Sequence, residues 1–180
     1  MRGQSGTERG MRKQAVVERQ LAADRAAAFV DARNLALEFV GMQPGSWLDP
    51  MVAGVVLQPG ESLRRLVNAW LRQRTPEGWT EPSWSQVFVT DQRLLVRLGS
   101  GELASLWWGS LVGFEADLVA DHVVLDFGDG LPRLLSGPSA AVMAVAGVAA
   151  LYGPAALATH PALSPIRADR YVTQSVRPTD

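Results

Sequence analysis

The sequence contains no cysteine in its 180 residues. This absence excludes disulfide bonds, thiolate metal sites, iron–sulfur clusters and cysteine nucleophiles. Histidine is scarce, because only His122 and His160 are present and they are not spaced like metal ligands. A Walker loop, a Gly-x-Ser-x-Gly nucleophile elbow and a Gly-x-Gly-x-x-Gly phosphate loop are also missing. We therefore expect no catalytic, metal-binding or cofactor-binding residues, no cofactor and no enzymatic activity.

Long apolar runs are missing as well. No uninterrupted stretch reaches the roughly 18 residues that a membrane-spanning helix needs, and the first 19 residues lack the apolar region of a signal peptide. The sequence therefore predicts a cytoplasmic protein without a transmembrane segment. Hydrophobic residues make up 47% and charged residues 19% of the chain, which is typical of a folded globular protein.

Residues 8–40 carry the periodicity of a long amphipathic helix. The residues of its apolar stripe are Val17, Leu21, Ala28, Ala32, Leu35 and Phe39. Gly41 can end this helix in a left-handed conformation, and Pro44 cannot continue it. Three uses of the helix remain open: packing on its own domain, pairing with a second copy as a homo-oligomer, or docking on another protein. Basic and acidic residues are interspersed along residues 1–40, which disfavours a membrane-surface helix.

A connector rich in proline and glycine leads into short β-rich runs. Seven strands are predicted, at residues 62–72, 83–90, 93–98, 102–108, 111–118, 122–127 and 131–135. The turn signals between them are tight, and Thr90-Asp91-Gln92 is a hairpin signal. Such close spacing is typical of an antiparallel meander rather than of alternating strands and helices.

The sequence period then changes to that of a helix. Ser136-Gly-Pro-Ser offers a helix start, and a small-residue stripe over 142–152 ends at Gly153-Pro154. One C-terminal helix is therefore expected to close the sheet, followed by an extended, partly ordered tail rich in proline. The predicted organisation is an N-terminal helix and linker at 1–53, a β-domain at 54–153 and a tail at 154–180.

The tryptophans are numerous, with six in the chain. Core filling is the default role for them, because large aromatic side chains dominate the packing of a small domain. Trp107 and Trp108 are adjacent in a predicted strand, so one should face the core and the other the surface. The candidate partner contacts are Trp79, Trp107, Arg72 and Arg74.

Alternation also assigns faces to the first strand. It places nearly all of Leu63, Val67, Ala69 and Leu71 on one face of the strand. Leu66 and Trp70 fall on the opposite face. Both faces of this strand are therefore partly apolar, which suits a strand that bends across two sheets.

Three phrases of the sequence resemble bacterial PH-like and GRAM-like domains of the pleckstrin-homology superfold. They are Val87-Phe-Val-Thr-Asp-Gln-Arg-Leu-Leu-Val, Leu106-Trp-Trp-Gly-Ser-Leu-Val-Gly-Phe and Val123-Val-Leu-Asp-Phe-Gly-Asp-Gly. The resemblance covers about residues 59–153, and its motifs are structural. It implies an α+β fold with a seven-stranded antiparallel barrel or sandwich capped by a C-terminal helix. It also implies a non-catalytic interaction or scaffolding module that binds a protein or a peptide.

Two other function classes are weighed against this interpretation. A small hydrolase could use Asp117, Asp121 and His122, although a hydrogen-bonded histidine at the start of a strand is the preferred account. A small-ligand or membrane-surface binding domain is the other alternative. Nucleic acid is not an expected partner.

Recognition of phosphoinositides is not expected either. Arg72 and Arg74 enter the loop between the first two predicted strands, but Glu77 and Glu81 lie in the same loop. Residues 54–153 contain seven arginines and ten acidic residues, so their net charge is 7 − 10 = −3. An anionic leaflet repels a domain with net negative charge.

Overall fold

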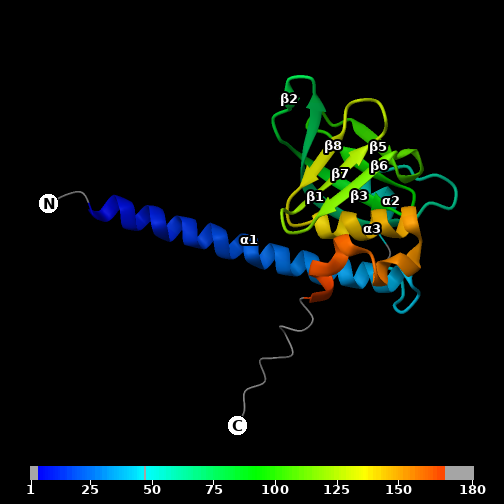
Figure 1. The fold of residues 1–180 in the computed structure, drawn as a ribbon, viewed down its shortest axis with the longest axis horizontal. Coiled ribbons are helices and arrows are strands. Elements are labelled where there is room, and N and C mark those ends of the chain that lie inside the picture. The colour runs from blue at the N-terminus through cyan, green and yellow to red at the C-terminus, as the bar shows by residue number, and fades with distance from the viewer. Residues whose placement is uncertain (1–3, 47, 169–180) are drawn as a thin grey trace, which may run out of the picture.

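The computed structural model describes residues 4–46 and 48–168, with side chains from residue 13 onward. Figure 1 shows a long helix, α1 (Gln4–Phe39), that projects from a body made of an antiparallel sheet and further helices. The fold class is α+β, and the long N-terminal helix that the sequence predicts is present. Among the described residues, no helix combines the length and the apolar character that crossing a bilayer requires.

Eight strands form the sheet, and all neighbouring strands run antiparallel. They are β1 (Leu63–Thr75), β2 (Gly78–Trp79), β3 (Ser83–Thr90), β4 (Arg93–Arg97), β5 (Leu103–Trp107), β6 (Gly113–Asp117), β7 (His122–Asp126) and β8 (Arg133–Ser136). Their order is β5-β4-β3-β1-β8-β7-β6, and β2 pairs with the end of β1. The seven predicted strands are found, whereas β2 lies in a predicted loop. No ladder in the described part of the chain joins β5 to β6, so the sheet is open.

Strand β1 joins the two halves of the sheet. It pairs with β3 over most of its length and with β8 at residues 70–73. Strands β1, β3, β4 and β5 form one meander, and β6, β7 and β8 form another. The turn between β3 and β4 is organised by Thr90, whose hydroxyl accepts hydrogen bonds from the amides of Gln92 at 3.1 Å and Arg93 at 2.9 Å. The hairpin predicted at residues 90–92 is thus confirmed.

Helix α3 (Ala140–Tyr152) lies at the centre of the body. All of its residues from 140 to 149 are buried, because the sheet covers one side and α1 the other (Figure 1). Gly147 allows close approach to the sheet, since a Cβ atom there would lie 2.6 Å from the Phe114 ring. Phe29, Ala32 and Leu35 of α1 belong to the same apolar core. Packing on its own domain is therefore the observed use of the C-terminal part of α1.

The other face of the sheet carries a second, smaller apolar cluster. Leu63 contacts Phe88 and Leu95 there, together with Val55 from the segment after helix α2 (Pro50–Ala53). Val67, Ala69 and Leu71 lie on the face of the main core as predicted, whereas Leu63 lies on the opposite face. The register of β1 against β3 shifts between Leu63 and Arg65, and one extra residue in a strand moves its side chains to the opposite face.

The beginning of the predicted tail is folded rather than extended. Two short 3₁₀ helices, η2 (Pro154–Ala158) and η3 (Pro161–Leu163), are followed by a helical turn at residues 164–168. Leu157, Leu163 and Ile166 are buried in the main core. These apolar side chains hold the segment against the helices, which composition alone does not reveal. The remaining tail residues, 169–180, lie outside the described residues.

Candidate functional site

The outward face of the sheet, opposite α3, carries two exposed tryptophans. Residues opposite each other in an antiparallel pair point to the same side, and Trp70 of β1 lies opposite Trp84 of β3. Their ring centroids are 4.8 Å apart with an interplanar angle of 60°. Trp70 is 43% exposed and Trp84 53%, and Leu66, four residues before Trp70 on the same strand, is 43% exposed. We call Trp70 and Trp84 the tryptophan patch.

Three of the four candidate contact residues lie together at the hairpin beyond this patch. The Nε atom of Arg72 donates a hydrogen bond of 2.7 Å to the Thr80 carbonyl, and another of its nitrogens donates to the Trp79 carbonyl at 3.4 Å. The Arg72 side chain therefore links β1 to residues 79 and 80 on the other side of the hairpin. The exposed Arg74 guanidinium lies 5.7 Å from the centre of the Trp79 ring. Arg74 is thus the residue of the three that a partner can reach most directly.

Trp107 lies apart from the other candidates, on β5. Its ring is half-buried beneath the guanidinium of Arg93, 4.3 Å from the ring centre. Trp108 is only 3% exposed and belongs to the main core. The prediction that these two tryptophans face opposite sides is confirmed. Trp107 therefore packs against the Arg93 guanidinium and is not part of the tryptophan patch.

The residues considered for a hydrolase form the hairpin between β6 and β7. Asp117 lies opposite His122 in the ladder. One oxygen of Asp117 accepts hydrogen bonds from the amides of Val119 at 2.9 Å and Ala120 at 3.0 Å. These bonds, led by the one from Ala120, hold the pKa of Asp117 below its ordinary value. The carboxylate is thus used to shape the turn.

Asp121 fixes the body to α1. Its carboxylate lies 3.2 Å from Nε of Arg25, and another nitrogen of Arg25 donates to the Leu118 carbonyl. Burial raises the pKa of Asp121 above its ordinary value, and the nearby Asp117 carboxylate adds to this effect while Arg25 opposes it. Asp121 also has a φ of 51°, in the left-handed region that aspartate tolerates better than most residues. In the described part of the chain, no group of three or more His, Asp or Glu side chains could hold a metal ion.

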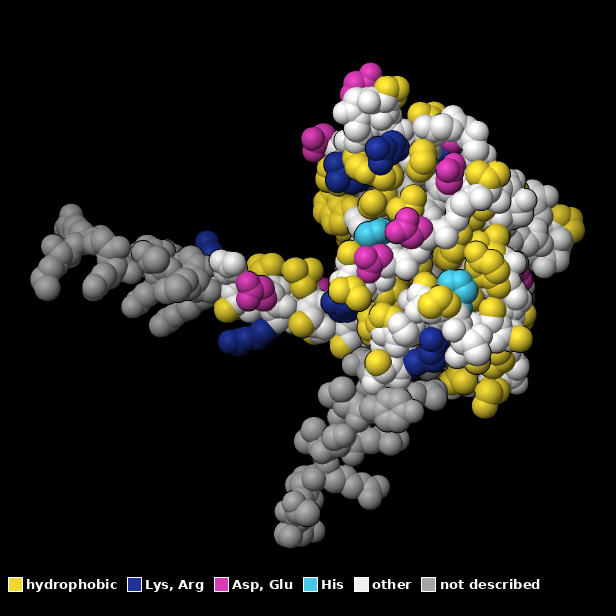
Figure 2. Space-filling model, in the orientation of Figure 1, with side chains coloured by type: hydrophobic (Ala, Val, Ile, Leu, Met, Phe, Trp, Pro, Cys, Tyr) yellow, Lys and Arg dark blue, Asp and Glu magenta, His cyan; other side chains and the backbone are white. Residues whose placement is uncertain are grey.

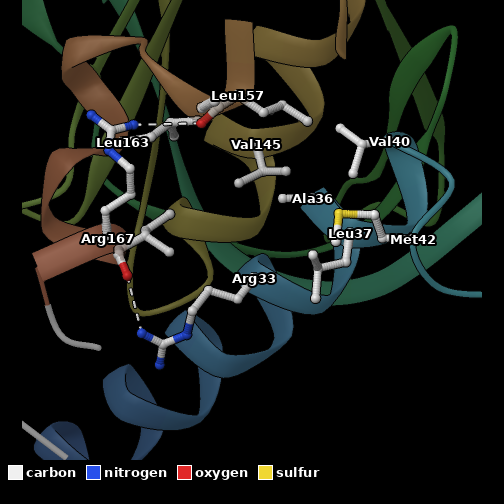
Figure 3. A pocket seen from close by; sticks show the side chains of 11 residues that line it. Arg33, Ala36, Leu37, Val40, Met42, Val145, Leu157, Leu163 and Arg167 are labelled. Atoms are coloured by element: carbon white, nitrogen blue, oxygen red, sulfur yellow. Dashed lines mark hydrogen bonds between the residues drawn. The ribbon is translucent and has the colours of Figure 1, made fainter. Parts of the chain in front are cut away.

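A groove of 660 Å³ lies on the helical side of the molecule, between the end of α1, α3 and the C-terminal turns (Figure 3). Its lining is mostly apolar and includes Ala36, Leu37, Met42, Val145, Leu157 and Ile166. Arg33 and Arg167 line it too, but both are turned toward backbone. Arg33 donates to the Ile166 carbonyl at 3.0 Å, and Arg167 donates to the His160 carbonyl at 3.1 Å. The arginines thus anchor the C-terminal turns.

The tryptophan patch was missed by sequence reasoning. Alternation placed Leu66 and Trp70 on one face, but the register that brings Trp84 beside Trp70 could not be read from local periodicity. Comparison with known proteins gives no guide, because no protein-family model and no curated protein matches this chain. The patch is therefore identified by its geometry and exposure.

We expect the protein not to bind membranes through phosphoinositides. Arg72 is committed to the hairpin carbonyls, and residues 54–153 carry a net charge of −3. A basic residue near an anionic leaflet contributes about 1 kcal/mol, so Arg74 alone offsets little of this repulsion. Liposome co-sedimentation at low salt, with and without phosphoinositide, should show equal and low binding. Binding that rises with phosphoinositide and disappears on joint Arg72→Ala and Arg74→Ala substitution would contradict this expectation.

Proposed function

We propose that this chain is a non-catalytic interaction module with a PH-like fold, and that it binds a protein or a peptide through the tryptophan patch. The PH-like part of the proposal is supported by the strand arrangement. A four-stranded and a three-stranded meander meet at β1 and β8, and a helix follows the last strand. Seven strands closed by one C-terminal helix are what the resemblance implies.

The observation that carries the binding function is the exposure of Trp70 and Trp84. Tryptophan is enriched among the few residues that dominate the binding energy of protein interfaces. Two large aromatic side chains that lie in contact and remain about half exposed leave apolar surface in water, at a cost of about 25 cal/mol per Å². A partner that covers both rings recovers this free energy.

The charges beside the patch indicate the chemistry of the partner. Arg72 and Arg74 follow Trp70 at two-residue steps, so all three lie on the outward face of β1. Arg74 is exposed and lies about 14 Å from Trp70 along the strand. We propose a partner segment with apolar side chains over the tryptophans and an acidic side chain near Arg74, because complementary charges fix the register of an interface.

Affinity capture from the native extract tests this function. The full chain should recover a stoichiometric partner, and the Trp84→Ser protein should bind the recovered partner roughly 30-fold more weakly, since a central hot-spot residue contributes about 2 kcal/mol or more. The affinity is measured by calorimetry with the purified partner. Arg74→Glu should also weaken binding, and more strongly at low salt.

Tyr152→Ser is the matched control. Tyr152 is 55% exposed at the end of α3, on the helical side of the molecule, so its loss should leave the affinity unchanged. Repeated capture of nothing but the protein itself would refute the function. Equal affinity of the Trp84→Ser and wild-type proteins would show that binding uses another surface.

A further inference from the structure

The side chains of residues 13–24 of α1 are not packed against the body. Figures 1 and 2 show the N-terminal half of α1 projecting away from the body, and apolar and charged side chains lie along the part whose side chains are described. Residues 13–24 are all exposed except Ala15, and Val16, Val17 and Leu21 are 63%, 57% and 53% exposed. Residues 4–24 extend over about 30 Å at 1.5 Å per residue. Most of the stability of a helix in a protein comes from the packing of its apolar face, which this part of α1 lacks within its own chain.

The exposed apolar residues continue the face of α1 that the body covers. Val17 and Leu21 are four residues apart, and seven-residue steps lead from Leu21 to Ala28 and Leu35, so all four lie on one face. Leu35 is buried against the core. The contact between α1 and the body ends at Arg25, whose side chain contacts the turn at residues 118–121. Beyond Arg25 the same face continues, and no other described residue covers it.

We infer that this face pairs with the same face of a second copy, in an antiparallel two-fold dimer. A two-fold interface brings the same surface of both subunits together. The apolar face of α1 in one copy can therefore cover the apolar face of α1 in the other. The continuity with the α1–α3 packing supports this assignment. A helix partner extends the kind of contact that the C-terminal half of α1 already makes with α3.

Charge sets the antiparallel orientation. Residues 4–19 contain four basic and two acidic residues, a net charge of 4 − 2 = +2. A parallel pair would place these basic segments side by side. In an antiparallel pair each basic segment instead reaches the partner's turn at 118–121, where Asp117 and the 76% exposed Val119 lie beside the Arg25–Asp121 ion pair. Opposite charges then meet at both ends of the dimer.

The surface area buried between the two copies sets the expected affinity of the dimer. Two helices that overlap for about 30 Å, with a contact strip roughly 10 Å wide, bury on the order of 600 Å² in total. Stable interfaces bury at least about 1,200 Å². The contact between each helix end and the partner's body must therefore supply the remainder. We expect a dissociation constant in the micromolar range, which rises with salt concentration because the end contacts are ionic.

Sedimentation equilibrium of the full chain between about 1 and 200 µM tests the dimer in this affinity range. The wild-type protein should dimerise, and Leu21→Glu should raise the dissociation constant at least tenfold. Val30→Glu is the matched control, because Val30 is 51% exposed and lies nine residues from Leu21, half a turn around α1. Its dissociation constant should stay within about twofold of the wild-type value. A wild-type monomer at 200 µM, or equal effects of both variants, would overturn the inference.

The absence of cysteine allows a direct test of the orientation. The test uses the double variant Ser5→Cys/Val119→Cys. Within one copy, Val119 lies next to Arg25, because Arg25 donates a hydrogen bond to the Val119 carbonyl. Ser5 lies about 30 Å from Arg25 along the helix, so the two cysteines of one copy are about 30 Å apart. A short bismaleimide can therefore link them only between copies. The antiparallel dimer should give covalent dimers that Leu21→Glu suppresses. Dimers in solution that this reagent does not link would refute the antiparallel arrangement.

Discussion

Replacing Arg93 with alanine is expected to lower the free energy of unfolding by about 3–5 kcal/mol, because it breaks a buried ion pair. Arg93 is 6% exposed and Glu61 8%. Two nitrogens of Arg93 donate hydrogen bonds of 2.9 Å to the two carboxylate oxygens of Glu61. The third nitrogen, Nη1, donates to the Ser105 hydroxyl at 2.9 Å, and Nη2, which already binds Glu61, also donates to the Val56 carbonyl at 3.0 Å. Alanine would leave the Glu61 carboxylate buried without its counter-charge.

Thermal and urea denaturation measure this effect, and the melting temperature should fall by roughly 10 °C for a chain of this size. Arg133→Ala is the control, because its partner Asp129 is exposed and the pair lies at the surface. It should change the melting temperature little. The double variant Glu61→Leu/Arg93→Met should be more stable than Arg93→Ala, since apolar residues can replace a buried pair at little cost. A double variant as unstable as Arg93→Ala would show that the cost does not come from the uncompensated charge.

Replacing Arg65 with alanine is expected to release α1 from the sheet and to cost about 3 kcal/mol, at the lower end of the range for buried pairs. Arg65 of β1 donates to Glu38 at 2.7 Å and to Asp31 at 2.7 Å. The Glu38 side chain is 3% exposed, whereas that of Asp31 is 39% exposed and stays hydrated. Hydrogen exchange of residues 29–39 should accelerate together with the loss in melting temperature. Glu18→Gln, at an exposed position of the same helix, should change neither.

The ion pair between Arg65 and Glu38 should also make the attachment of α1 to the sheet weaker at low pH. Burial alone would raise the pKa of Glu38, but hydrogen bonds from Arg65 and Ser46 and the charge of Arg65 lower it below its ordinary value of 4.5. The stability that the ionised Glu38 provides is therefore complete above pH 4.5, and it is lost as the pH falls through the lower pKa of the folded state. Glu38→Gln should be less stable than the wild-type protein near pH 7. The difference should shrink below pH 4.5; a difference that does not change with pH would contradict this linkage.

Local sequence signals predicted many of the turns and element ends correctly, because these features depend on only a few neighbouring residues. Thr90 and Asp91 form the predicted turn, and β3 (Ser83–Thr90) has the predicted bounds. Gly41 adopts a φ of 74° at the predicted end of α1, and the amide of Met42 donates to the Leu37 carbonyl at 2.9 Å. These features depend on backbone preferences and on hydrogen bonds within one or two turns of chain.

The candidate site could not be predicted in the same way. Trp70 and Trp84 are neighbours only in the observed register, and a slip by one residue would turn one ring to the other face. The shift at Arg65 shows that this register is not uniform along β1. Local periodicity could not predict it, because the free energy that decides it comes from contacts between distant segments. Arg72 was likewise a candidate partner contact in the sequence. Only the position of the Thr80 carbonyl showed that its side chain binds the other side of its own hairpin.

The sequence by itself determined the class of the main segments: a long N-terminal helix, seven strands in order, one alanine-rich helix, and no cysteine chemistry. The tertiary structure alone decided which faces meet. It buried Leu163 and Ile166 of the expected tail in the main core, and it left Leu21 and Trp84 exposed. The physical reason is that periodicity records which side of a segment is apolar, whereas burial depends on which distant segments compete to cover that side.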